Sequence, residues 1–163
     1  MAEAGDRILV AFDGSPPSLA AASLAFDLAD WTGGAVRLLA VVADDEAGRL
    51  IDRFSHFNGR AEERREEDLR SAVDYVVGIG QRRGVAIEPV VRTTGSGGEA
   101  FTEILSEAGQ WGAAWIFMGR TSSSGPGRAL LGSQTEHILE FARVPVVVVP
   151  AGGTDPPREP AED

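Results

Sequence analysis

Two loop segments of the 163-residue chain carry residues that suit the binding of a phosphate group. The Asp-Gly-Ser segment 13–15 follows a short apolar run, and the glycine- and serine-rich segment 119–133 follows another and leads into a helical pattern. Glycine lets the backbone approach a ligand closely, and the free N–H groups at the start of a helix favour an anion. We therefore predict that phosphate binds at the backbone N–H groups of Gly132, Ser133 and Gln134.

The net charge of the chain opposes anion binding anywhere else on the surface. The sequence holds 25 Asp and Glu residues against 15 Lys and Arg, a formal net charge of −10. Because such a surface repels polyanions, we expect neither nucleic acid nor a membrane as a partner. A phosphate must then be held locally, by backbone N–H groups, by one or two arginines and by a divalent cation.

Composition also limits the compartment and the chemistry. The chain has no cysteine, which excludes a disulfide framework, a thiolate metal site and a cysteine nucleophile. Residues 1–7 include two acidic side chains and no apolar stretch, and no later apolar run reaches the length of a membrane span. We therefore expect a cytoplasmic protein.

Apolar runs that alternate with helical patterns define the elements that must position these loops. The predicted strands are residues 7–12, 36–42, 85–93, 115–118 and 144–149, and the predicted helices run from Ser15 to the Gly33-Gly34 pair, up to Gly84, over 99–108 and over 133–142. Continuous apolar strands separated by helices are typical of a parallel sheet covered on both faces. Ligands of such sheets bind beyond the carboxyl ends of the strands, so the two loops would converge if the first and fourth strands are neighbours.

This pattern predicts one doubly wound α/β domain over residues 1–150, with the proline-rich segment 151–163 as a disordered acidic tail. Residues 43–60 are expected to form a partly ordered excursion. In the first helix, Ser15 suits the N-cap and Pro16 the first turn. The residues predicted to form its buried face are Ala21, Leu24, Ala25, Leu28 and Trp31. Trp111 and Trp115 are also interpreted as packing residues.

Several of these segments together resemble one known family. Residues 8–15, the pair Met118-Gly119, the pair Gly132-Ser133 and the closing valine run 145–149 resemble the universal stress protein family. Its nucleotide-binding members carry the motif Gly-x2-Gly-x9-Gly-Ser/Thr. Here Gly119, Gly132 and Ser133 keep the spacing, while Ser122 replaces the second glycine.

The resemblance implies a Rossmann-like five-stranded parallel sheet in the order 3-2-1-4-5 and a site for ATP, AMP or another adenine nucleotide, with Mg²⁺ or Mn²⁺ bridging the phosphates. It also implies a homodimer that pairs through strand 144–149, and a role in stress response or signalling with at most slow hydrolysis. We assign no catalytic residue and no protein side chain as a metal ligand. The predicted nucleotide contacts are Ala11, Phe12, Asp13, Val41, Met118, Gly119, Ser122, Arg128, Gly132, Ser133 and Gln134.

Other interpretations of the same residues stay open. Ser133 and Glu136 fit a Ser-x-x-Glu capping box, and Asp13 could merely satisfy the N–H groups of a turn. Phe12 could stack on the base or fill its space, and Ser122 could crowd the phosphates. The alternative function is a dimeric interaction module without nucleotide, and a true ATPase is a third hypothesis.

Overall fold

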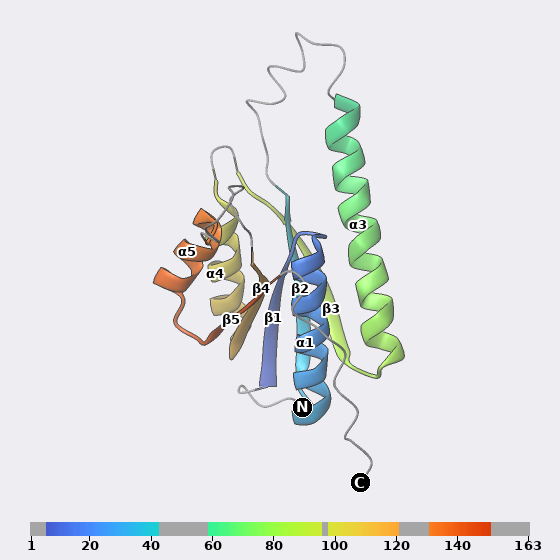
Figure 1. The fold of residues 1–163 in the computed structure, drawn as a ribbon, viewed down its shortest axis with the longest axis vertical. Coiled ribbons are helices and arrows are strands. Elements are labelled where there is room, and N and C mark those ends of the chain that lie inside the picture. The colour runs from blue at the N-terminus through green and yellow to red at the C-terminus, as the bar shows by residue number, and fades with distance from the viewer. Residues whose placement is uncertain (1–5, 43–58, 96–97, 121–130, 151–163) are drawn as a thin grey trace.

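The computed structural model describes residues 6–42, 59–95, 98–120 and 131–150, shown in colour in Figure 1. Helices and strands alternate along these residues. Their bounds are β1 Arg7–Phe12, α1 Pro16–Thr32, β2 Ala35–Val42, α3 Gly59–Arg82, β3 Ala86–Thr93, α4 Ala100–Trp111, β4 Trp115–Gly119, α5 Ser133–Phe141 and β5 Val146–Val149. No helix in these ranges combines the length and the apolar character that crossing a membrane requires.

The five strands form one parallel sheet in the order β3-β2-β1-β4-β5. Strand β1 lies at its centre, where Ala11 is opposite Leu39 of β2 and Met118 of β4. This arrangement confirms the predicted doubly wound α/β fold and its strand order. It also makes β1 and β4 neighbours, so the loops that follow them start from the same edge of the sheet.

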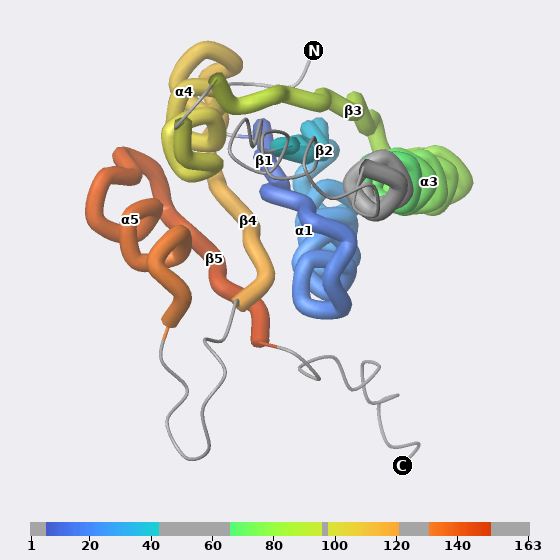
Figure 2. Tube along the Cα trace, turned by 90° about the horizontal axis from the view of Figure 1, so that it is seen from above, coloured from blue at the N-terminus to red at the C-terminus, as the bar shows by residue number. Residues whose placement is uncertain are grey.

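Each face of the sheet is covered by two helices, and each pair encloses its own apolar core (Figure 2). Helices α1 and α3 cover the face to which Val10 and Leu38 point, and both of these side chains are fully buried. Helices α4 and α5 cover the other face, where Leu9 and Leu39 are fully buried. Because neighbouring residues of a strand point to opposite faces, nearly every residue of the central strands is apolar.

Helix α1 begins as the sequence predicts, and Ala21 and Ala25 are buried as predicted, but part of the predicted face is exposed. The hydroxyl of Ser15 accepts a hydrogen bond from the N–H of Ser18 at 3.4 Å, and Gly33 ends the helix with a positive φ of 71°. Trp31 is 82% exposed and Leu24 is 38% exposed, so their prediction as buried residues is wrong. The buried face consists of Ser18, Ala21, Ala22, Ala25, Phe26 and Ala29. These mostly small side chains let the helix lie close to the sheet, which turns the bulky ones outward.

Several predicted boundaries shift. Helix α4 ends at Trp111, three residues later than predicted, and the bounds of β2, β3 and β4 each move by one residue. Helix α3 begins at Gly59, inside the predicted excursion, and the rest of that excursion, 43–58, lies outside the described residues. Strand β5 begins at Val146, two residues later than predicted, and helix α5 ends at Phe141, one residue earlier. The predicted tail, 151–163, also lies outside the described residues.

Candidate functional site

A cavity of about 130 Å³ lies where the carboxyl ends of β1, β2 and β4 meet the amino-terminal turns of α4 and α5. Most of its walls are apolar, since they extend the core beneath α4 and α5. Asp13, Ser18 and Gln134 contribute its polar groups. The lining residues are Ala11, Phe12, Asp13, Ser18, Leu39, Val41, Ala100, Ile104, Met118, Gly119, Gln134 and Ile138.

Most of the residues predicted as nucleotide contacts come together at this edge. Seven line the cavity, namely Ala11, Phe12, Asp13, Val41, Met118, Gly119 and Gln134. Gly132 and Ser133 immediately precede Gln134 at the start of α5. Ser122 and Arg128 lie outside the described residues, so their contacts stay predictions.

Five lining residues were not predicted, because contacts were expected only in the loops and at the adjoining ends of strands and of one helix. These are Ser18, Leu39, Ala100, Ile104 and Ile138. Three of these residues could have been predicted from the regular spacing of side chains along a strand or a helix. Leu39 is two residues before Val41 on β2 and therefore points to the same face, and Ala100 and Ile104 are one turn apart on α4.

The turn after β1 places Asp13 at the rim of the cavity. Asp13 is exposed, and its Oδ1 accepts a hydrogen bond from the N–H of Ser15 at 2.9 Å. Gly14 between them has a positive φ of 80°, a conformation that glycine adopts without strain. Oδ1 of Asp13 therefore satisfies an N–H group of the turn, as one of the two interpretations of Asp13 expected. Phe12 packs in the core beneath α1 and α3 and leaves the cavity open beside it.

Gly119, the first glycine of the motif, is required by the packing of the fold. A Cβ atom at this position would lie 2.5 Å from both Pro17 C and Ser18 N, in the backbone at the start of α1. Real Cβ atoms do not approach other atoms so closely, and backbone atoms cannot turn aside as a flexible side chain does. Glycine at this position lets the first turn of α1 pack against the end of β4.

The start of α5 differs from the predicted capping box. Gly132 is the N-cap, with φ −67° and ψ 154°, and as a glycine it offers no side chain to cap the helix. Ser133 is exposed and is the first residue of the helix, one position later than a capping box requires. The capping-box interpretation of Ser133 and Glu136 is therefore wrong, and a helix N-terminus whose N-cap residue has no side chain adjoins the cavity.

Comparison with known protein families matches residues 5–150 to the universal stress protein family. The chain belongs to this family. Among solved structures, the chain is similar to a universal stress protein family member from Burkholderia pseudomallei, at 26% identity and a TM-score of 0.65, over 93% of this chain and 100% of that one. No curated protein matches the chain.

Two more solved structures share the fold of this universal stress protein. One is a universal stress protein from Archaeoglobus fulgidus in complex with dAMP, at 19% identity and a TM-score of 0.63, over 88% of this chain and 96% of that one. The other is a universal stress protein in complex with cAMP, at 17% identity and a TM-score of 0.63, over 91% of this chain and 99% of that one.

Helices α4 and α5 of the universal stress protein are joined beside the cavity. Oε1 of Gln134 accepts a hydrogen bond from the backbone N–H of Phe101 at 2.8 Å. The ring of His137, one turn later on α5, lies 4.6 Å from the ring of Phe101, measured between centroids. His137 on α5 therefore packs against α4.

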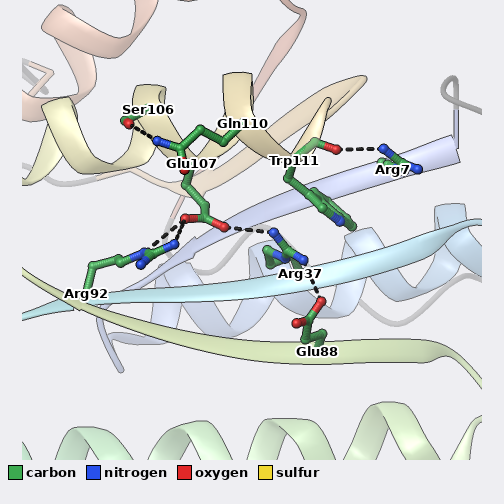
Figure 3. Close-up of polar contacts among 8 residues, drawn as sticks. All are labelled: Arg7, Arg37, Glu88, Arg92, Ser106, Glu107, Gln110 and Trp111. Atoms are coloured by element: carbon green, nitrogen blue, oxygen red, sulfur yellow. Dashed lines mark hydrogen bonds and ion pairs between the residues drawn. The ribbon is translucent and has the colours of Figure 1, made fainter.

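A buried ion-pair network fixes α4 on the sheet (Figure 3). Glu107 is 4% exposed and accepts hydrogen bonds from Arg37 Nη1 at 2.8 Å and from Arg92 Nη2 at 2.7 Å. Arg37 also donates to Glu88 at 2.6 Å, and its guanidinium lies 4.5 Å from the centroid of the Trp111 ring. The network therefore ties α4 to both β2 and β3.

The charged state of Glu107 depends on these arginines. Burial raises its pKa, but the hydrogen bonds from Arg92 and Arg37 together outweigh burial and hold the pKa below its ordinary value of 4.5. Helix α4 places Glu107 one turn after Ile104, and β2 places Arg37 two residues before Leu39. The network therefore holds the same helix and the same strand that contribute Ile104 and Leu39 to the cavity lining.

Metal ligands do not gather in the parts of the chain that the structure describes. Within these residues, no three His, Cys, Asp or Glu side chains are placed to hold a metal ion together.

Proposed function

We propose that this universal stress protein binds an adenine nucleotide, ATP or a related one such as AMP, with the base in the cavity and the phosphates at the start of α5. The observation that carries the proposal is the position of the cavity. It opens at the carboxyl edge of neighbouring strands β1 and β4, beside a helix N-terminus whose N-cap is a glycine. That edge is where open parallel sheets bind ligands.

The chemistry of the cavity suits a nucleotide with its base inserted. A volume of about 130 Å³ approaches that of an apolar protein cavity known to hold one benzene ring, roughly 150 Å³. It is therefore suited to a heteroaromatic base but too small for a whole nucleotide. Val41, Met118 and Ile104 offer apolar surface to such a ring, and the carboxylate of Asp13 at the rim can accept hydrogen bonds from ribose hydroxyls.

The phosphates would then lie outside the cavity, near Gly132, Ser133 and Gln134. At a helix start, backbone N–H groups and the helix dipole both favour negative charge. This local attraction is needed because the chain carries a net charge of −10. The relatives solved with dAMP and with cAMP bind ligands that combine an adenine base with a phosphate, which supports the same class of ligand here.

The finer parts of the proposal follow from this site. A divalent cation, Mg²⁺ or Mn²⁺, bridges the phosphates and offsets the acidic surface. Hydrolysis is at most slow, because backbone N–H groups bind the ground state of a phosphate as well as its transition state. Nucleotide occupancy then serves as a cytoplasmic stress signal.

The proposed homodimer forms through β5. This strand lies at the edge of the sheet with β4 as its neighbour, and three of its four valines are only partly buried. Pairing with a second copy would cover an apolar edge that otherwise invites aggregation.

Calorimetric titration of the full chain with ATP and magnesium tests the binding proposal, using wild type and Gly132→Asp. The φ of −67° at Gly132 suits any residue, and Asp is a favoured N-cap, so the variant should fold normally. Its carboxylate would occupy the phosphate position and repel the ligand. The matched control is Gly109→Asp, on α4, where an added Cβ meets no atom within 4 Å.

Saturable binding that persists in Gly109→Asp and is lost in Gly132→Asp would support the proposed site. If folded wild type binds neither ATP, AMP nor a cyclic nucleotide, the proposal fails. The alternative, an interaction module without nucleotide, would then account better for the fold. Equal binding by both variants would place the nucleotide away from α5.

A further inference from the structure

Helix α4 supplies part of the cavity wall and is tied to the rest of the fold at two points. Its lining residues are Ala100 and Ile104, and Ile104 is buried. The first tie is in the first turn, where Gln134 Oε1 accepts a hydrogen bond from the N–H of Phe101 at 2.8 Å. This N–H has no partner within the helix, so Gln134 caps α4 from α5. The second tie is Glu107, one turn after Ile104.

The two carboxylate oxygens of Glu107 bond to two different strands (Figure 3). Oε1 accepts from Nη1 of Arg37, on β2, at 2.8 Å. Oε2 accepts from Nε and Nη2 of Arg92, on β3, at 3.0 Å and 2.7 Å. A carboxylate can accept at both oxygens at once, whereas a carboxamide has one oxygen and one amine. Glu107 can therefore join α4 to both strands only as a carboxylate.

The register of the sheet places these two arginines next to the cavity-lining residues of β2. Those residues are Leu39 and Val41. Arg37 is two residues before Leu39 and therefore points to the same face of the sheet. Arg92 is the residue of β3 that lies opposite Val41. The two arginines thus bracket the part of β2 that lines the cavity, and Glu107 joins both of them to α4.

A buried charge at this position has a cost that an apolar side chain would avoid. Glu107 is 4% exposed, and taking a carboxylate out of water is unfavourable unless its partners compensate. Apolar packing could fill the same space, but it is not directional and would not hold α4 at one position over two strands. Hydrogen bonds to two fixed guanidinium groups are directional. The network is therefore suited to fixing where α4 lies.

We propose that Glu107 is a positioning residue for ligand binding in the cavity. By joining α4 to β2 and β3 together, it holds Ile104 at a fixed place relative to Leu39 and Val41, and so sets the space that the base enters. Glu107 does not itself line the cavity. This inference rests on the proposed function and deepens it, because it adds a residue that acts on the ligand only through α4.

Glu107→Gln tests the tie with little change in side-chain size. The single oxygen of Gln can replace Oε1 or Oε2 but not both, and its amine, a donor, then meets the donors of the other arginine. Helix α4 would stay joined to only one strand. Glu88→Gln is the matched control, because Glu88 lies on β3 and bonds to the same Arg37 at 2.6 Å. It alters the network without removing a bond to α4.

A second control separates positioning from a general loss of stability. Val76→Ala leaves a void in the core beneath α1 and α3, where Val76 is fully buried. That core is on the opposite face of the sheet from α4 and α5. The variant should therefore lose stability without a change in the cavity.

The experiment measures binding of adenosine and ATP to the full-length wild type and the three variants by calorimetry, well below their melting temperatures. Glu107→Gln should weaken adenosine binding by about two- to thirtyfold, the range expected for a residue that acts on a site through its neighbours. ATP should weaken by the same factor, because the two ligands share the base. Glu88→Gln and Val76→Ala should match wild type.

Hydrogen exchange of the backbone amides without ligand tests the same tie directly. In Glu107→Gln the amides of α4 should exchange faster relative to those of α1, because local opening reports the loss of local contacts. Val76→Ala should show no such selective change. Equal exchange of α4 in Glu107→Gln and wild type would overturn the proposal.

Two binding results would also overturn it. One is unchanged adenosine affinity in Glu107→Gln, and the other is an equal loss of affinity in Val76→Ala, since affinity would then follow stability alone. If wild type binds neither adenosine nor ATP, the proposed function itself fails and a role for Glu107 in binding fails with it. Adenosine binding by wild type together with unchanged binding by Glu107→Gln would refute the positioning role alone.

Discussion

Replacing Glu107 with Gln should destabilise the protein more than its small change in shape suggests. The substitution removes the charge that pairs with Arg37 and Arg92 but keeps one oxygen as an acceptor. Breaking a fully buried ion pair costs about 3–5 kcal/mol. Arg92 is 46% exposed and Arg37 retains Glu88, so we expect about 2 kcal/mol here. For a chain of this length, that lowers the melting temperature by about 4–8 °C.

The matched control is Glu88→Gln. Glu88 bonds to the same Arg37, but its side chain is 61% exposed, and an exposed ion pair contributes less than about 1 kcal/mol. Urea unfolding of both variants, followed by circular dichroism at near-neutral pH, measures the two free energies of unfolding. Equal losses in the two variants would refute the assignment of a buried charge network at Glu107.

The same comparison has a defined dependence on pH. The pKa of Glu107 is held below its ordinary value of 4.5, so the unfolded chain takes up a proton first as the pH falls. The stabilisation by the ionised carboxylate is therefore complete above 4.5 and is lost as the pH falls through the lower folded-state pKa. The difference between wild type and Glu107→Gln should shrink over that acid range. A difference that stays constant there would contradict this account.

Two further substitutions test the packing of α1. Gly119→Ala should cost about 1–3 kcal/mol, because its Cβ would overlap backbone atoms of Pro17 and Ser18, and urea unfolding measures the loss. Gly109→Ala, where a Cβ meets no atom within 4 Å, is the control and should be neutral or stabilising. Trp31→Gln should change the free energy of unfolding by less than about 0.5 kcal/mol, because Trp31 is 82% exposed, and a large loss in thermal unfolding would show that Trp31 is buried after all.

The sequence was sufficient to predict the architecture, because the strands of a doubly wound sheet are buried on both faces. Such strands appear as short continuous apolar runs, as β1 and β2 do, and each run is followed by a helical pattern. The strand order came from the family resemblance, and the pairing of β1 with both β2 and β4 confirms it. Loop chemistry then identified the edge of the sheet where the cavity lies.

Details that depend on side-chain partners far apart in the sequence were not predicted. Helical spacing alone allowed two adjacent faces of α1 to be buried, and the alanine-rich face packs closer to the sheet than the face with Trp31. The charge network joins β2, β3 and α4, and nothing local to Glu107 indicates its two arginine partners. Gln134 caps a helix that begins 34 residues earlier, at Ala100.

The two glycines of the motif that the structure describes have different physical meanings. Gly119 is needed for α1 to pack against β4, so this fold would keep it without any ligand. Gly132 has an ordinary negative φ at an N-cap, where Ser, Asp or Asn would stabilise the helix slightly more. The conformation of Gly132 therefore gives no reason for a glycine, whereas close approach of a phosphate does. It follows that loss of binding in Gly119→Ala would not separate folding from recognition. Loss of binding in Gly132→Asp at unchanged stability would identify the phosphate position directly.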